Sequence, residues 1–326
     1  MSLNFSVEFP TDSQNVQLLS WLVGLILTNA FGTVANTVLL LVMFVHKSLR
    51  RSSSCSLIVH CITIDLYLAA VVQPIFSIPI YLGPLHRLPR YFCQFQPLSV
   101  YSVYTAGMYA SSNLAIHRLF ATVWPQKFTV LTGKPVLVGL IVSPWILALG
   151  VNIFPTLELG IAMGRNPDSG ACQFVETGLG QYPLLISTLF AVYIPTAVTG
   201  VCYLLIMAKT YGEVREKKGR YVQRRLEISR TLFLSFVWHC LTMYPPSVVM
   251  AFYADDYAGH FALQLGMHWL IMSFSAMNPV NENGRAVFDL KFCPRLFCPV
   301  LGIFLGQLKA LSRRHPEGSS LQVENP

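Results

Sequence analysis

The segment SLIVHCITIDLYLAAVVQPIFSIPIYL covers residues 56–82, and Asp65 is its single Asp, Glu, Lys or Arg residue. A helix needs roughly 20 apolar residues to cross a hydrocarbon core about 30 Å thick. Because lipid offers no hydrogen-bond partners to the backbone, an apolar run of this length is expected to be helical. Residues 56–82 therefore predict a membrane-spanning helix that carries one carboxyl group near its middle.

Six other apolar runs of comparable length occur along the chain. They cover residues 18–45, 93–123, 136–157, 184–208, 228–253 and 261–281. A soluble protein rarely holds so many, since its surface helices need a polar face. We therefore predict an all-α membrane protein, a seven-transmembrane helix bundle. Its parts are an extracellular tail at 1–17, the seven-helix domain at 18–298 and a cytoplasmic tail at 299–326.

The distribution of charge predicts the orientation of the bundle. The net charge is +8, and only 12% of the 326 residues are charged, about half the usual share for a globular protein. With the N-terminus outside, all but three of the 23 Lys and Arg residues are cytoplasmic; the exceptions are Arg87, Arg90 and Arg165. This bias predicts a multi-pass protein with the N-terminus extracellular and the C-terminus cytoplasmic. The charges suit contact with anionic lipids or docking of a cytosolic partner, and nucleic acid is not expected.

Cysteines and one asparagine predict covalent modifications. Cys93 and Cys172 are the two cysteines predicted to lie outside, where oxidising conditions favour a disulfide between them. Cys293 and Cys298 follow the last run at the inner membrane surface, which makes them palmitoylation candidates; free thiols are the alternative. Asn4 opens the triplet Asn-Phe-Ser, an acceptor sequence for N-glycosylation on the outer side.

Asp65 predicts a polar site inside the bundle. A carboxylate at that depth costs several kcal/mol unless it faces a polar interior. Asn36 on the first run, with Ser275 and Asn278 on the seventh, are candidate partners. These oxygen-bearing side chains suit a Na⁺ ion at Asp65, and no other cofactor is expected. The alternative is a neutral or hydrogen-bonded Asp65 that only joins helices.

Arg118 lies near the inner end of the third run, and Tyr203 lies at a similar depth on the fifth. A guanidinium stays charged and needs a partner or a water-filled vestibule at that depth. A side chain that reaches the headgroups is the simpler alternative.

Taken in order, these features resemble those of class A (rhodopsin-like) G-protein-coupled receptors. Gly32 and Asn36 fit the first-helix pattern, Asp65 fits the second-helix acid, and Cys93 precedes Arg118 by the family's usual spacing of 25 residues. The remaining matches are Val123-Trp124-Pro125, Trp145, Pro155, Pro195, Tyr203, Asn278-Pro279 and, in a short amphipathic eighth helix, Phe288. The resemblance covers about residues 18–298.

The resemblance implies a plasma-membrane location, an extracellular ligand, a heterotrimeric G protein as partner, and opening of the cytoplasmic end. The family's switch motifs are altered, however: His117 and Leu119 flank Arg118, Glu282 replaces a tyrosine, and Met243 stands in a sixth helix without Cys-Trp-x-Pro. A receptor-fold protein that scavenges ligand or modulates a partner receptor therefore remains an alternative. For the resting partner of Arg118 the sequence offers Glu227 or Glu282.

The resemblance also places the ligand in an outer cavity between the helices. Val100 stands where amine receptors carry an Asp, and Met272 stands at the retinal lysine, so neither an amine nor retinal is expected. Gly107 and Phe274 replace polar residues that often surround the family's sodium ion. The candidate ligand-binding residues are Gln73, Gln96, Val100, Tyr101, Tyr104, Tyr244, His268 and Trp269. Such an aromatic set with neutral polar groups suits a peptide end, a lipid or a small organic molecule; interhelical packing is the alternative.

Two other classes of function lack their sequence features. The chain contains neither His-Glu-x-x-His nor Gly-x-Ser-x-Gly, the motifs of zinc proteases and serine hydrolases, so we do not expect an enzyme. Transporters tend to be built from inverted repeats, and the seven unequal runs show none.

Overall fold

The computed structural model describes residues 12–45, 54–83, 86–126, 128, 132–166, 170–176, 182–216, 220–252 and 260–282. Several of the residues predicted from sequence lie outside this part: Asn4, Phe288, Cys293 and Cys298. The side chains of Glu227, Asn278 and Glu282 also lie outside it, although their backbones belong to described helices.

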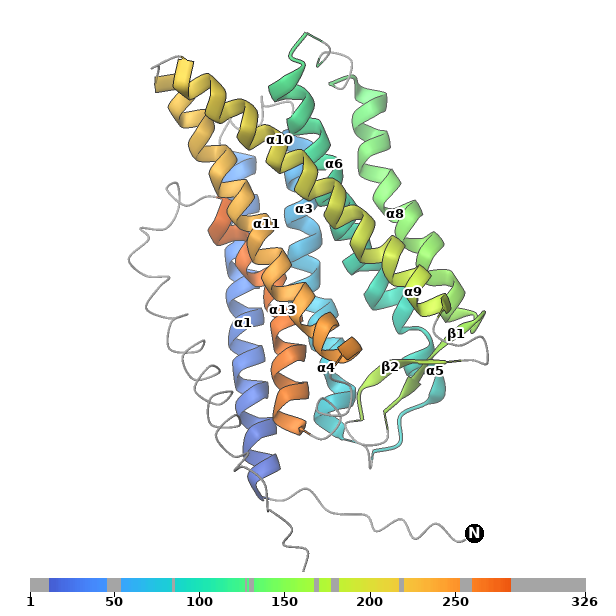
Figure 1. The fold of residues 1–326 in the computed structure, drawn as a ribbon. Helices are drawn as coiled ribbons and strands as arrows, with labels where there is room; N and C mark the ends of the chain where they lie inside the picture. The colour runs from blue at the N-terminus through green and yellow to red at the C-terminus, as the bar shows by residue number, and fades with distance from the viewer. Residues whose placement is uncertain are drawn as a thin grey trace, which may run out of the picture. The chain divides into compact units, whose positions relative to one another are not determined.

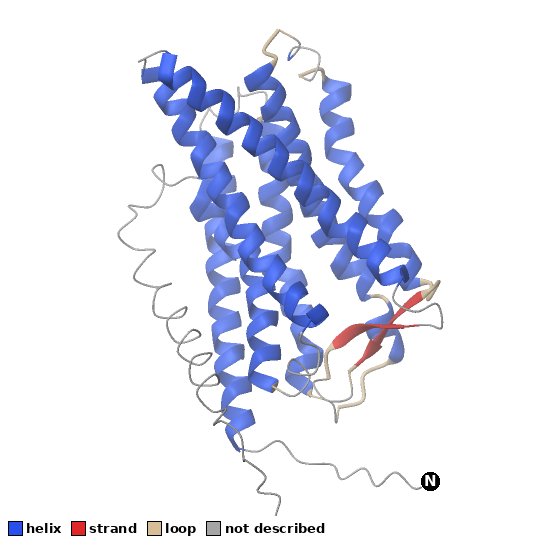
Figure 2. Cartoon of the chain, viewed as in Figure 1, coloured by secondary structure: helices blue, strands red, loops and turns tan. Residues whose placement is uncertain are grey.

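Each of the seven apolar runs forms a helical span in the described part of the chain (Figures 1 and 2). The first is α1 (Asp12–Val45), the fourth α8 (Lys134–Thr156), the sixth α11 (Arg220–Phe252) and the seventh α13 (Phe261–Glu282). The second comprises α3 (Cys55–Tyr67), η1 (Leu68–Val72) and α4 (Gln73–Leu82). The third comprises α5 (Arg90–Gln94), η2 (Pro97–Tyr101) and α6 (Ser102–Val123), and the fifth α9 (Tyr182–Thr188), η3 (Leu189–Tyr193) and α10 (Ile194–Glu216).

The spans differ in how apolar they are. By length and composition four described helices can cross a membrane, namely Val16–Val45, Cys55–Leu82, Lys134–Thr156 and Tyr182–Arg215, and Phe261–Ala276 is a shorter apolar helix. The third span is less apolar than these helices because α6 carries buried polar residues, among them Thr105, Ser112 and His117. These residues are compatible with a membrane because α6 packs against α3, α8 and α10, so its polar side chains face protein.

The two helices nearest the chain ends pack closely against each other. In Figure 1, α13 lies beside α1, and α13 also contacts α11. The approach is closest at Gly32, where an added Cβ would lie 2.9 Å from the Cα of Ala276. Only a residue without a side chain fits at this crossing, which explains the glycine in the first-helix pattern.

Three π-helical turns interrupt the spans. They are η1 (Leu68–Val72), η2 (Pro97–Tyr101) and η3 (Leu189–Tyr193). A π-turn holds one residue more than an α-turn and often lies near a functional site. Gln73 directly follows η1, while Val100 and Tyr101 lie within η2, so two of the turns adjoin predicted ligand-binding residues.

A β-hairpin follows α8 and was not predicted from the sequence. Strands β1 (Ile161–Arg165) and β2 (Cys172–Glu176) pair antiparallel, with Ile161 opposite Glu176 and Arg165 opposite Cys172. The hairpin, red in Figure 2, lies at one end of the bundle beside the third and fourth spans, where β1 contacts α5 and α8. We call this the outer end and the opposite end the inner end, after the orientation that the sequence predicts.

Candidate functional site

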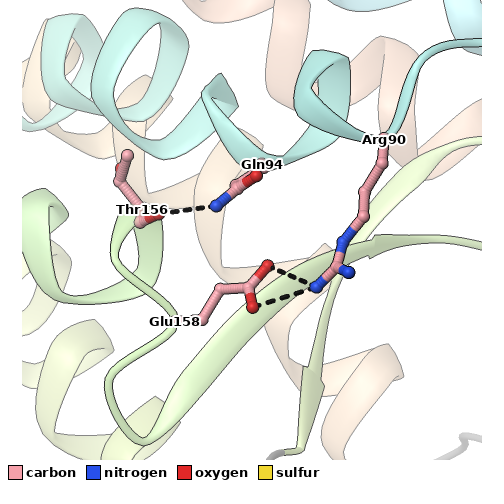
Figure 3. Close-up of polar contacts among 4 residues, drawn as sticks. All are labelled: Arg90, Gln94, Thr156 and Glu158. Atoms are coloured by element: carbon pink, nitrogen blue, oxygen red, sulfur yellow. Dashed lines mark hydrogen bonds and ion pairs between the residues drawn. The ribbon is translucent and has the colours of Figure 1, made fainter.

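The hairpin is anchored to the outer end of the third span. A disulfide joins Cys93 to Cys172 with a Cα–Cα distance of 5.4 Å, in agreement with the predicted pairing. Nearby, one guanidinium nitrogen of Arg90 lies 3.0 Å from each carboxylate oxygen of Glu158 (Figure 3). The Gln94 amide donates to the carbonyl oxygen of Thr156 over 3.4 Å. One covalent and two polar contacts thus hold the third span to the end of α8 and to the segment that follows it.

Arg165 connects the hairpin to the first outer loop. Its Nε donates to the carbonyl oxygen of Gly170 over 3.0 Å, and its other two nitrogens donate to the carbonyl oxygens of His86 and Gly83. A planar guanidinium carries five N–H donors, so it can bind several carbonyls at once. Arg165 therefore joins two outer loops that lie far apart in the sequence.

An aromatic row runs across the outer half of the bundle. We define the row as Phe174, Tyr101, Phe76, His268 and Trp21. Successive ring centroids lie 5.1, 5.8, 4.8 and 6.5 Å apart, distances at which aromatic rings attract one another. The row leads from the hairpin through the third, second and seventh spans to the first. It contains Tyr101 and His268, two of the predicted ligand-binding residues.

Buried polar groups adjoin this row. The Gln73 amide nitrogen donates to the carbonyl oxygen of Met272 over 2.7 Å and to the hydroxyl of Ser275 over 2.8 Å. The hydroxyl of Tyr104 interacts with the same Gln73 side chain. Within the described part of the chain, no partner with hydrogen-bond geometry exists for Nε2 of His268. A buried polar atom left unpaired costs about 1–3 kcal/mol, so this nitrogen is available to a ligand or to water.

The other predicted ligand-binding residues lie in different surroundings. Trp269 donates to the hydroxyl of Thr28 over 3.1 Å and so connects α13 with α1. Tyr244 lies beside Tyr193, with ring centroids 5.9 Å apart. Val100 is buried in an apolar cluster with Val103, among others. Both polar side-chain atoms of Gln96 are buried and unpaired among the described residues. The eight residues therefore do not form one group, and their role in binding stays a prediction.

The predicted cation site is partly assembled. The Asn36 amide donates to the carbonyl oxygens of Gly32 over 2.9 Å and Ser275 over 3.3 Å. The hydroxyl of Ser275 accepts a hydrogen bond from Gln73, so Ser275 contacts both Gln73 and Asn36. Asp65 is buried, with 8% of its surface exposed. The structure thus brings Asn36 and Ser275 together.

An inner cavity of about 60 Å³ lies between α3, α6, α10, α11 and α13. Asp65 and Tyr203 line it, as does His239, which the sequence did not single out. His239 meets Phe274 in a T-shaped contact with ring centroids 4.6 Å apart. A signal was present in the sequence: Ser235 and His239 lie four residues apart in an apolar run, which puts both on one helix face.

The sequence was next compared with known families. A family model described as "7 transmembrane receptor (rhodopsin family)" matches residues 35–280. The chain belongs to this family. A search of curated proteins finds no match to this chain. Rhodopsin-family proteins are multi-pass membrane receptors rather than enzymes, and as a class they bind an extracellular ligand and a G protein.

The inner end of this rhodopsin-family receptor contains an unusual contact. His117, in the place of the family's acid, is fully buried, and its Nδ1 lies 3.1 Å from the hydroxyl of Ser54. Its ring also meets Phe128 edge-on at 4.9 Å between centroids. The neighbouring Arg118 is partly exposed and forms no salt bridge with any side chain that the structure describes. In this receptor His117 thus connects the first and second inner loops.

Proposed function

We propose that this receptor binds a non-amine extracellular ligand at the outer end of the bundle and opens its cytoplasmic end to a heterotrimeric G protein. The observation that supports the site is a pair of buried atoms in the aromatic row, Nε2 of His268 and Nε1 of Trp21, that have no hydrogen-bond partner among the described residues. Native proteins leave few buried polar atoms unpaired. Two in one aromatic row favour a bound molecule that completes their hydrogen bonds.

The chemistry of the site supports a neutral polar ligand. Oε1 of Gln73 accepts a hydrogen bond, and the Tyr104 hydroxyl donates or accepts. The aromatic row offers a surface for a flat apolar group. Val100 is aliphatic and gives an ammonium group no counter-charge. A peptide end, a lipid or a small organic molecule with one or two hydrogen-bonding groups fits this combination.

The proposed orientation places the N-terminus outside and the C-terminus in the cytoplasm of the cell, with the bundle in the plasma membrane. Two observations support it: the positive-inside bias of the sequence and the disulfide at the end opposite Arg118. The same orientation exposes Asn4 to glycosylation enzymes and puts Cys293 and Cys298 at the inner leaflet, where palmitoylation occurs.

The proposed signalling mechanism is a two-state equilibrium. A ligand shifts such an equilibrium only by its difference in affinity for the two states. In the open state the inner end of α11 moves away and uncovers Arg118, Tyr203 and the basic third inner loop. In the resting state Arg118 pairs with Glu227 or Glu282.

A Na⁺ ion is the proposed cofactor, bound by Asp65 with Asn36, Ser275 and Asn278. The burial of Asp65 supports it, since a carboxylate inside a membrane bundle needs compensation. The test compares thermal unfolding of the purified receptor in sodium and in N-methylglucamine chloride. Sodium should raise the midpoint of the wild-type receptor and leave that of Asp65→Asn unchanged; equal midpoints for the wild type would remove the proposal.

The ligand proposal is tested with a pair of tyrosine variants on α6. A library is screened for compounds that raise the unfolding midpoint, because a molecule that binds the native state stabilises it by mass action. Tyr104→Phe removes a buried hydroxyl that interacts with Gln73, so it should weaken stabilisation by the hits when each variant is compared with its own ligand-free midpoint. Tyr109→Phe is the control, because that hydroxyl already donates to the carbonyl oxygen of Phe190 over 2.8 Å. If both variants respond to hits as the wild type does, the ligand does not use Tyr104.

A second candidate function is a receptor that binds ligand without activating G proteins. The contact of His117 with Ser54 and Phe128 favours it, because an imidazole takes the place of the family's acid beside Arg118. A G-protein activation assay separates the two, with Arg118→Ala as the control. Basal or ligand-dependent activity that Arg118→Ala abolishes supports coupling; stabilising hits that give no activation support the second function.

A further inference from the structure

Strand β2 of the outer hairpin has one edge without a neighbouring strand. Within the described part of the chain there is one sheet, and in it β2 pairs with β1 alone. A sheet edge offers unpaired N–H and C=O groups to any segment that can extend along it. We propose that residues 3–9 of this chain's own N-terminal tail occupy the edge as a third strand, over the Phe174 end of the aromatic row.

The register of the hairpin shows which backbone groups face the free edge. Beyond the pair Arg165 and Cys172, the amide of Asn166 donates to the carbonyl oxygen of Ala171 over 2.7 Å. Hydrogen-bonded and non-hydrogen-bonded pairs alternate along an antiparallel ladder, so Cys172 and Phe174 belong to non-hydrogen-bonded pairs. Their N–H and C=O groups therefore point away from β1. Among the described residues these groups have no backbone partner.

The two faces of β2 have different surroundings. Successive side chains of a strand point to opposite faces, so Cys172 and Phe174 share one face. This face meets the bundle through the disulfide of Cys172 and through the ring of Phe174, whose centroid lies 5.1 Å from that of Tyr101. Gln173 and Val175 are on the other face and are exposed. A strand that fits this edge needs apolar side chains toward the bundle and polar ones toward water.

The N-terminal tail alternates in the same way. Residues 3–9 have the sequence Leu-Asn-Phe-Ser-Val-Glu-Phe, with an apolar side chain at every odd position and a polar one at every even position. Strict alternation of this kind is typical of a strand with one buried face, and Pro10 bounds the run. Asn4 is on the polar face, which leaves its predicted acceptor sequence open to a glycan. The pattern therefore matches both faces of the edge.

The tail is also long enough to reach β2. It leads into α1 at Asp12, and Trp21 of the same helix is the last ring of the row that starts at Phe174. The row has four ring-to-ring steps, each of at most 6.5 Å. An extended chain covers about 3.3 Å per residue, so residues 3–11 reach about 30 Å. That length exceeds the row, and the tail can return across the outer end to the hairpin.

The test is a crosslink that reports which face each tail residue takes. Val175 is on the exposed face, so in either strand direction its neighbour on the third strand is an even-numbered residue. In the full-length receptor, Val175→Cys combined with Ser6→Cys or Glu8→Cys should form a disulfide when copper phenanthroline is added as oxidant. The matched controls combine Val175→Cys with Phe5→Cys or Val7→Cys and should form little. Peptide mass spectrometry identifies the bond.

Hydrogen exchange gives a second measurement that needs no new cysteine. A third strand protects the amides of Cys172 and Phe174, which should exchange at least about tenfold more slowly in the full chain than in a variant without residues 2–10. Val7→Lys puts a charge on the apolar face, so it should raise the rates toward those of the deletion variant. Glu8→Lys adds the same side chain on the polar face and should leave the rates unchanged.

Three outcomes would overturn the proposal. One is a crosslink yield that is the same for odd and even tail positions. Another is equal exchange in the full chain and in the deletion variant, because the edge then stays open, as a separate peptide ligand would require. The third is a covalent dimer of the single variant Val175→Cys, which would assign the edge to a second copy of the chain.

Discussion

The Nδ1 atom of His117 lies 3.1 Å from the hydroxyl oxygen of Ser54, across two spans that are 63 residues apart in the sequence. Ser54 directly precedes α3 and makes no side-chain capping bond to that helix. Its hydroxyl instead contacts His117, the residue that replaces the acid of the family's motif. The same histidine contacts Phe128, so one buried side chain fixes two inner loops.

Ser54→Ala should destabilise the receptor by about 1–3 kcal/mol, because it leaves a buried imidazole without its partner. Thermal unfolding of the purified protein measures the loss. Ser20→Ala is the control, since that hydroxyl is exposed and bonds only within its own helix. Equal midpoints for the two variants would show that the contact contributes nothing.

Gly32→Ala should destabilise the crossing of α1 and α13. The new Cβ would lie 2.9 Å from both Cα and Cβ of Ala276, and such overpacking costs typically about 1–3 kcal/mol. Gly24→Ala, on the same helix, meets only an ordinary contact at 3.8 Å with Trp269. It should be neutral or should stabilise α1 by up to about 1 kcal/mol through helix propensity. The opposite order of unfolding midpoints would contradict this packing.

The two anchors of the hairpin should differ greatly in strength. Replacing Cys93 and Cys172 together by Ala should cost about 2–5 kcal/mol and reduce surface expression. Arg90→Ala should cost at most about 1 kcal/mol, because the Arg90 side chain is 83% exposed in its pair with Glu158. Flow cytometry of an N-terminally tagged receptor, together with unfolding midpoints, compares them. A loss for Arg90→Ala as large as that for the cysteine pair would reverse the ranking.

Glu227→Gln and Glu282→Gln test the resting partner of Arg118. If either carboxylate holds the guanidinium, its loss should raise ligand-free G-protein activation several-fold, because the closed state loses an ion pair that the open state lacks. The double variant with Arg118→Ala serves as the background control. Unchanged basal activity in both single variants would exclude them as partners.

The sequence predicted the spans well and their ends less well. The second run ends at Leu82 as predicted, because the apolar composition that defines it changes there. In contrast, α1 begins at Asp12 and α11 at Arg220, outside the apolar runs. A membrane helix continues beyond the lipid where polar residues stay helical in water. Hydropathy does not indicate how far that extension reaches.

Within the candidate site, the sequence predicted residues whose chemistry is unusual for their position and missed those defined by packing. The disulfide between Cys93 and Cys172 was predicted from the oxidising conditions outside the cell. The polar surroundings of Asp65 were predicted from the free-energy cost of burying a charge. The role of Trp269 as a donor to Thr28 and the place of His239 in the cavity depend on how neighbouring helices face each other. Helical periodicity within one span does not specify that rotation.

The π-turns have a consequence for how the outer half of the bundle can change. One residue of an α-helix corresponds to about 100° of rotation, and η1 lies between Asp65 and Gln73. Loss of a single codon within Leu68–Val72 would therefore turn Gln73 and the rest of α4 to another direction while Asp65 keeps its place. The direction of the predicted ligand-binding residue Gln73 therefore depends on the length of this turn, while that of Asp65 does not.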